Sequence, residues 1–217
     1  MFIIIGNQKG GAGKSTLTML LANYLTMIKE FKVTVLDMDY QRSIFTLYER
    51  AKILENPELY EVIEAEAEYF PTVFEILKKQ TDRIILIDLP GKLDDNSLVP
   101  VYQAADLILI PFVYDAMTYD STIVFSIVMR KINPDVKFVY VPTRIKTNVK
   151  YETKQDVDKE FGTFGAVTEA ITEKIDFQRV NTQHTPLSLY PIITPVFEDI
   201  INNYINPMLK GEKTNGW

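Results

Sequence analysis

The residues whose types and spacing could do chemistry are concentrated near the start of the chain, in a loop rich in glycine and lysine. Residues 7–16 read Asn-Gln-Lys-Gly-Gly-Ala-Gly-Lys-Ser-Thr, between an apolar run and a helix-like stretch. Glycine reaches positive φ and has no β-carbon, so Gly10, Gly11 and Gly13 allow successive backbone N–H groups to surround an anion. A strand, such a turn and a helix start in this order predict a phosphate-binding loop.

Two polar side chains of this loop suit a nucleoside triphosphate with a magnesium ion. Lys14 would place a positive charge on the outer phosphates, and the Ser15 hydroxyl is a ligand of the kind that Mg²⁺ prefers. The helix that opens at Ser15 adds unpaired amides and the positive end of its dipole. The expected phosphate-contacting residues are Gly10, Gly11, Ala12, Gly13, Lys14, Ser15 and Thr16.

Three aspartates follow apolar runs of the kind that form buried strands. Asp88 follows residues 84–87, and Asp37 and Asp39 follow residues 32–36. Ligands of an open α/β sheet bind at the carboxyl ends of its strands, so we expect Asp88 to hold Mg²⁺ through a water. Alternate side chains of an extended segment share a side, so Asp37 and Asp39 can both face the phosphates. The alternatives are a turn aspartate at residue 88 and helix caps at residues 37 or 39.

The loop departs from the ordinary G-x-x-x-x-G-K-[ST] pattern in one place. Gln8 stands at the position of the first glycine, and Lys9 is an additional lysine. The form K-G-G-x-G-K-S resembles that of the deviant Walker A ATPases, the superfamily that includes the ParA partition proteins, the MinD division-site proteins and the nitrogenase iron proteins. The resemblance implies that Lys9 crosses a dimer interface to the partner's nucleotide, so that dimerisation depends on ATP.

Other segments resemble ParA proteins more closely. Residues 37–41 resemble the D-x-D-P-Q stretch of ParA switch loops, with Tyr40 in place of proline, and residues 104–111 resemble the A-A-D-x-x-x-x-P segment. The resemblance implies that Asp39 orients or deprotonates the attacking water and that Asp37 supports the metal shell. It therefore makes Lys9, Lys14 and Asp39 the expected catalytic residues.

Two further segments are expected to contact the nucleotide. Pro90 and Gly91 follow Asp88, where ParA-like proteins usually have two prolines, and the Gly91 amide is expected to approach the γ-phosphate. Thr143 and Arg144 follow an expected strand at the place where related proteins contact the base. Adenine is implied by the family alone, and Arg144 is equally expected to flank the base or to pair with a surface carboxylate.

Composition limits the class of protein. The chain has 217 residues, 47% of them hydrophobic, a net charge of −6 and no cysteine. The length suggests one domain, which we place at residues 1–209 with a polar tail at 210–217. Absence of cysteine excludes disulfides and an iron–sulfur role. No apolar stretch approaches the length of a membrane span, so we expect a cytoplasmic protein, with nucleoid association left open.

Strands alternating with helices predict a doubly wound α/β fold, with a mostly parallel central sheet and helices on both faces. Strands are expected at residues 2–5, 32–36, 84–87, 107–110, 138–141 and 166–170. Helices are expected at residues 17–28, 43–54, 58–68, 71–79, 151–161 and 195–204, the last one broken before Pro207. One more helix is expected to start at Asp120 or Ser121 and to run through Val128.

Three features of the sequence carry no firm role. The acidic residues 58–68 suit a solvated face or a docking surface for a basic partner. Basic residues outnumber acidic ones at 130–154, which suits either non-specific contacts with DNA phosphates or an ordinary solvated face. His184, in a polar stretch, has no neighbouring ligand of its type, and we assign it no function.

The expected function is that of a ParA-like ATPase, a slow switch in the partitioning or positioning of DNA. A homodimer with ATP bound, a ParB-like activator protein and no membrane are the partners that the resemblance implies. A membrane-cycling role like that of MinD is disfavoured because Pro207 interrupts the C-terminal helix. The alternatives are a metabolic enzyme similar to dethiobiotin synthetase and an adaptor that binds ATP without hydrolysing it.

Overall fold

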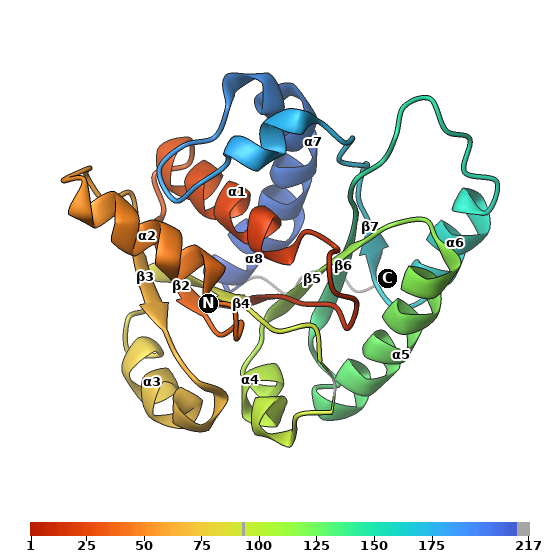
Figure 1. Ribbon diagram of the computed structural model, residues 1–217. Helices are drawn as coiled ribbons and strands as arrows, with labels where there is room; N and C mark the ends of the chain where they lie inside the picture. The colour runs from red at the N-terminus through yellow and green to blue at the C-terminus, as the bar shows by residue number, and fades with distance from the viewer. Residues whose placement is uncertain (93, 212–217) are drawn as a thin grey trace.

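The computed structural model describes residues 1–92 and 94–211. Within these residues, seven parallel strands form one sheet in the order β3-β2-β4-β1-β5-β6-β7, with helices on both faces (Figure 1). The strands are β1 (Phe2–Ile5), β2 (Lys32–Asp37), β3 (Glu61–Glu64), β4 (Arg83–Asp88), β5 (Leu107–Phe112), β6 (Lys137–Pro142) and β7 (Ala166–Val167). The expected doubly wound α/β fold is confirmed.

The helices divide into two layers. One face of the sheet is covered by α1 (Lys14–Met27), α2 (Ser43–Ile53) and α7 (Tyr190–Ile200) (Figure 1). The other face is covered by α3 (Phe70–Leu77), α4 (Val99–Gln103), α5 (Ala116–Ile132) and α6 (Lys154–Phe161). Among the described residues, no helix has the length and apolarity that crossing a membrane requires.

The central strands are apolar on both sides because both sides are packed under helices. In β1, Ile3 and Ile5 face the layer of α1 and α7, while Phe2 and Ile4 face the layer of α3, α4 and α5. This is the residue pattern of a parallel strand buried on both faces. Strand β1 is therefore a rigid base for the loop that follows it.

The strand register brings the ends of β2, β4 and β1 level. Asp88 is opposite both Ile5 and Asp37 in the sheet. Neighbouring strands lie roughly 5 Å apart, so the three loops that leave these ends are close together although they are far apart in the chain. The fold thus gathers the loops that hold most of the expected site.

The prediction of a helix over residues 58–68 is wrong. Residues 61–64 form β3, which pairs with β2, and a short 3₁₀ helix follows at Ala67–Tyr69. Val62 is buried in the layer of α1 and α7, Ile63 packs half-buried against the opposite layer, and Glu61 and Glu64 at the two ends of the strand are exposed. Pairing with β2 outweighs the helical propensity of the glutamates and alanines in this acidic segment.

Two helix boundaries also differ from the expected ones. Helix α5 begins at Ala116 because the carboxylate of Asp115 accepts the Thr118 amide as an N-cap, four or more residues before the expected start. Helix α7 begins at Tyr190 and contains Pro195, and it continues through a π-helical turn, Ile201–Ile205, into α8 (Asn206–Leu209). Pro207 lies in the first turn of α8, where a proline is tolerated, so the expected break before it is wrong. Of the expected tail, residues 212–217 lie outside the described part of the chain.

Both edges of the sheet are poor templates for further strand pairing. Strand β7 has two residues, and β3 carries Glu61 and Glu64, of which Glu61 forms an ion pair with Arg83. Short or charged edge strands disfavour pairing with another chain. The edges of this sheet are therefore closed to extension.

Candidate functional site

The loop between β1 and α1 has the backbone of a phosphate-binding turn. Gly11 and Gly13 have φ values of 79° and 86°, in the left-handed region that favours glycine, and Gly13 is the N-cap of α1. Because no side chain caps this helix start, its first amides are available to an anion. Gly10 and Gly11 are exposed, while Ala12 is buried and Gly13, Ser15 and Thr16 are half-buried.

Asn7 anchors the start of this loop, a role that the sequence did not indicate. Its side chain is 1% exposed, and its Nδ2 donates to the Pro111 carbonyl oxygen and to Thr122 Oγ1, both at 2.9 Å. Its Oδ1 accepts a longer hydrogen bond of 3.4 Å from the Lys9 amide. The loop is therefore fixed to the end of β5 and to α5.

The Lys14 ammonium is buried at the centre of the loop. Its side chain has no hydrogen bond or ion pair with any residue in the described ranges 1–92 and 94–211, and the residue is 7% exposed. Burial lowers the pKa of Lys14, while the charges of Asp88 and Asp39 act in the opposite direction. A buried cation without a partner is costly, and an anion such as a phosphate would pair with it.

Gly91 closes the loop from the side of β4. A β-carbon at this position would lie 3.1 Å from the Gln8 carbonyl oxygen, and 3.3 Å from both the Gly10 nitrogen and Lys14 Nζ. A side chain at position 91 would require the loop backbone or the lysine to shift by a few tenths of an ångström. Pro90 precedes Gly91 and is buried. Gly91 thus lies against the phosphate-binding turn, while the contact of residues 90 and 91 with a nucleotide stays a prediction.

Ser15 and Asp88 form the oxygen pair expected to hold a metal. The Ser15 hydroxyl donates a 2.6 Å hydrogen bond to Asp88 Oδ2, and Thr18 Oγ1 lies 3.2 Å from Asp88 Oδ1. Burial raises the pKa of Asp88 to about 7, against the Ser15 hydrogen bond, and the charge of Asp37 raises it further. A metal cation beside this buried carboxyl would favour its ionised form.

Magnesium fits these donors. Mg²⁺ prefers hard oxygen ligands and is commonly held by one or two protein groups, with phosphates and waters completing its shell. No cluster of three or more histidine, cysteine or acidic side chains placed to hold a metal exists among residues 1–92 and 94–211. The site thus suits an ion that arrives with a phosphorylated ligand, and Ser15 and Asp88 would supply the protein's share.

Asp37 serves as a helix cap in this structure. Its Oδ2 accepts the amides of Ile44 and Phe45 in the first turn of α2, at 3.0 and 2.9 Å. Burial raises its pKa, and these backbone hydrogen bonds act against the rise. The capping alternative is therefore observed for Asp37. Asp39 lies two residues on, half-buried, where its Oδ1 accepts the Gln41 amide at 2.9 Å.

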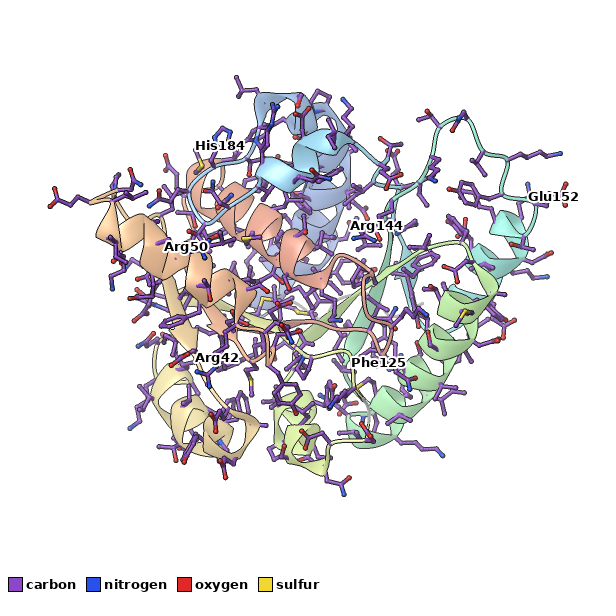
Figure 2. All side chains as sticks on the ribbon, viewed as in Figure 1. Arg42, Arg50, Phe125, Arg144, Glu152 and His184 are labelled. Atoms are coloured by element: carbon purple, nitrogen blue, oxygen red, sulfur yellow. The ribbon has the colours of Figure 1, made fainter. Side chains whose placement is uncertain are left out.

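Thr143 braces the phosphate-binding loop. Its hydroxyl lies 3.0 Å from the Ala12 carbonyl oxygen and 3.2 Å from that of Phe112, and the residue is buried. Arg144 next to it has a positive φ of 55°, and its Nη1 lies 4.0 Å from the position of a β-carbon on Gly11. Figure 2 shows Arg144 beside the first turn of α1. Arg144 forms no ion pair within the described part of the chain.

A pocket of about 270 Å³ lies between the start of α1 and a segment that the sequence did not single out. Thr16, Thr143 and Arg144 line it together with residues 171–178. The pocket opens beside the phosphate-binding turn, where a nucleoside attached to bound phosphates would extend. Its residues from the late segment are Ile171, Glu173, Lys174, Phe177 and Gln178.

Lys9 lies half-buried in the phosphate-binding loop. Its ammonium has no ion pair or hydrogen bond with any residue that the structure describes. Long side chains can follow a surface while leaving the charged end in water. The charge of Lys9 is therefore unpaired within the described residues of its own subunit.

The basic region at 130–154 is divided between two ends of the sheet. Arg130 donates to three backbone carbonyls and lies over the Phe138 ring, near the start of β6. Arg144 follows the end of β6, and Lys146 and Lys150 lie exposed on the long loop between β6 and α6 (Figure 1). These residues do not form one continuous surface. His184 lies away from the phosphate-binding loop, toward the last turns of α1 (Figure 2).

Comparison with known proteins agrees with this geometry. Residues 3–187 match the profile of the CobQ/CobB/MinD/ParA nucleotide-binding domain. This chain belongs to that family. The resemblance of its motifs to ParA proteins is thus confirmed at the level of the CobQ/CobB/MinD/ParA family, and the comparison with curated proteins finds no match.

Solved structures share the fold of this CobQ/CobB/MinD/ParA member. A plasmid partition protein from Borrelia burgdorferi is 25% identical, with a TM-score of 0.65 over 82% of this chain and 94% of that one. A candidate plasmid partition protein of Borrelia burgdorferi B31, bound to AMPPNP, is 23% identical, with a TM-score of 0.72 over 94% and 98%. The pNOB8 ParA bound to nonspecific DNA is 17% identical, with a TM-score of 0.63 over 97% and 99%.

Proposed function

We propose that this chain is a ParA-like ATPase that binds ATP with Mg²⁺, closes into a dimer over two nucleotides and hydrolyses ATP slowly as a switch in DNA partitioning or positioning. Membership of the CobQ/CobB/MinD/ParA family and the AMPPNP-bound relative support nucleotide binding. The observation that carries the switch is Lys9. Its unpaired ammonium next to the phosphate-binding turn is the group that a second subunit's phosphates would pair with.

The residues divide the work as follows. Lys14 and the amides of residues 10–16 bind and orient the phosphates. Ser15 and Asp88 would hold Mg²⁺, which when bound would supply positive charge near the phosphates. Asp39 orients the attacking water from the loop after β2. Asp37 supports this arrangement by holding the start of α2, in addition to the metal role that the resemblance implies.

The nucleoside is proposed to occupy the pocket between α1 and residues 171–178. Phe177 and Gln178 supply an aromatic surface and an amide there, a combination that can stack on a base and accept or donate hydrogen bonds. The free guanidinium of Arg144 favours a contact with the nucleotide over a surface ion pair. Adenine remains the proposed base.

Contacts with DNA and with an activator complete the proposal. The relative bound to nonspecific DNA supports DNA as a partner, and the exposed Lys146 and Lys150, on the loop that leaves β6 at Arg144, are the proposed phosphate contacts. A ParB-like protein is the proposed activator. With DNA as a partner, the proposed location is the cytoplasm, in association with the nucleoid.

Light scattering tests the central claim. Wild type is expected to double its mass with ATP and Mg²⁺ but not with ADP or without nucleotide, and Lys9→Ala is expected to stay a monomer while still binding ATP. Lys79→Ala, an exposed lysine without an ion pair in the described residues, serves as the matched control. Equal masses for wild type in all conditions would contradict the proposal.

Two alternatives are separated by turnover. If the protein is an adaptor that binds ATP without hydrolysing it, wild type would still dimerise with ATP. Wild type and Asp39→Ala would then show the same phosphate release. A metabolic enzyme would transfer phosphate to a small molecule and show no stimulation by DNA. The unpaired Lys9 favours the dimeric switch over the metabolic enzyme, because a monomeric kinase has no use for it.

A further inference from the structure

Tyr40, which stands where the ParA pattern has proline, connects two loops of the site. Its hydroxyl donates a 2.6 Å hydrogen bond to Asp95 Oδ2, although the residue is 56% exposed. Tyr40 follows Asp39 in the loop after β2, and Asp95 lies in the loop after β4, four residues beyond Gly91. The hydrogen bond therefore joins the loop of the proposed catalytic aspartate to the loop that lies against Lys14.

The loop after β4 holds both the ring and the hydroxyl of Tyr40. The Lys92 ammonium lies 5.3 Å from the centre of the Tyr40 ring, in a cation–π contact. Asp95 is fixed in turn, because its Oδ1 accepts the Ser97 amide at 2.9 Å and caps the 3₁₀ helix Asn96–Leu98. Tyr40 is thus bound between a cation and an anion of one short segment.

The other end of the Asp39 loop is fixed to β3. Arg42 forms ion pairs of 3.1 Å with Glu64 and 3.0 Å with Glu66, and Figure 2 shows it on the side of the molecule away from Arg144. Between Tyr40 and Arg42, the Gln41 amide bonds Asp39. A pocket of about 320 Å³ lies beneath this loop, so packing alone does not hold Asp39 in place.

We propose that Tyr40 is a positioning residue for ATP hydrolysis, and that through Asp95 it keeps Asp39 in register with the Gly91 segment. The proposal rests on the proposed function, in which Asp39 orients the attacking water. A misplacement of a reacting group by about 1 Å can cost up to about 100-fold in rate. The link is exposed, so its loss would move the loops without unfolding the protein.

The first test uses the nucleotide-free protein and measures amide hydrogen exchange. Tyr40→Phe removes the hydroxyl and keeps the ring, and Asp95→Ser keeps an N-cap oxygen while withdrawing the acceptor. Each variant is expected to speed exchange in both loops, residues 39–42 and 94–98, and the double variant should add nothing further. A change confined to the substituted loop, or the same change in Tyr69→Phe, would overturn the link. Tyr69 is the matched control because it is exposed and its hydroxyl has no partner among the described residues.

The second test separates kcat from KM in steady-state ATP hydrolysis. Tyr40→Phe and Asp95→Ser are each expected to lower kcat by about 3- to 10-fold and to leave KM within about 2-fold, since ground-state binding does not use Asp39. If wild type hydrolyses ATP and Tyr40→Phe has an unchanged or higher kcat, the positioning role is overturned. Absence of turnover in wild type would instead contradict the proposed function, and the exchange measurement would still decide whether the link exists.

Discussion

Ser15 and Asp88 are joined by a 2.6 Å hydrogen bond across the carboxyl ends of the sheet, at the point where the first turn of α1 passes β4. The carboxylate is fully buried, and within residues 1–92 and 94–211 the hydrogen-bond partner of its second oxygen is Thr18. Asp88 therefore affects two properties: its burial lowers the stability of the protein when the carboxyl ionises, and the same carboxylate is the proposed ligand of a cation. The two properties can be separated by substitution.

Asp88→Asn is expected to stabilise the protein in the absence of nucleotide and metal. Folding raises the pKa of Asp88 to about 7, so wild type loses stability as the pH rises from about 4 to about 7, whereas asparagine does not ionise. At about pH 8 we expect a gain of at least about 1 kcal/mol, or about 2–4 °C in melting temperature. Thermal unfolding in buffer with a chelator measures this gain.

The same variant should lose the stabilisation that ATP with Mg²⁺ gives wild type. Asp82→Asn is the control: it is exposed, and the hydrogen bond from Lys32 lowers its pKa, so no gain with rising pH is expected from it. A lower melting temperature for Asp88→Asn than for wild type at pH 8 would contradict the burial argument.

Gly91→Ala is expected to weaken nucleotide binding while leaving the empty protein nearly as stable as wild type. The new β-carbon would approach the Gln8 carbonyl oxygen at 3.1 Å and Lys14 Nζ at 3.3 Å, so the lysine must move from its position in the loop. We expect affinity for a fluorescent ATP analogue to fall by about 10-fold, which corresponds to about 1.4 kcal/mol. Unchanged affinity would mean that Gly91 does not border the bound phosphates.

Asn7→Ala is expected to destabilise the whole protein. It removes two 2.9 Å hydrogen bonds and leaves the buried Pro111 carbonyl and Thr122 hydroxyl without this donor. The expected cost is about 2–3 kcal/mol, seen as a fall of about 4–12 °C in melting temperature. Asn148→Ala, in an exposed loop, is the control and should change little. A loss as small as that of the control would show that the loop does not depend on Asn7.

Thr143→Val tests whether this residue reads the base or supports the loop. Valine keeps the shape of threonine and removes the hydroxyl that contacts the Ala12 carbonyl oxygen. We expect affinity for ATP and for GTP to fall by the same factor, about 3- to 10-fold, because the change acts through the loop. Thr168→Val is the matched control, because this threonine is also buried and its hydroxyl bonds the Glu169 carbonyl oxygen instead of the phosphate-binding loop. A change in the ratio of the two affinities would assign Thr143 to base recognition.

The central strands and the phosphate-binding loop could be predicted from the sequence because their signals are local. A run buried on both faces is apolar throughout, as in β4 and β5, and glycines at fixed spacing are visible without any knowledge of the fold. Strand β3 could not be predicted in this way. Its four residues become a strand through pairing with β2 and through ion pairs that Arg42 and Arg83 make with its glutamates.

The missed parts of the site depend on contacts between distant residues. Asn7 bonds groups 104 and 115 positions away, and residues 171–178 meet α1 only after the chain has crossed the sheet. The hydroxyl of Thr143 donates a hydrogen bond to the backbone of a loop 131 residues earlier. Spacing along a single sequence contains none of this information. The sequence therefore shows the residue types of the site but does not predict which distant residues they contact.

The two blunt edges of the sheet have a consequence for assembly. With a two-residue strand at one side and a charged one at the other, copies of this protein cannot grow into a ribbon by sharing backbone hydrogen bonds. In the proposed dimer, contact between copies would therefore use side chains and loops around the phosphate-binding site. Such an association would depend on the bound nucleotide and could form and dissociate repeatedly.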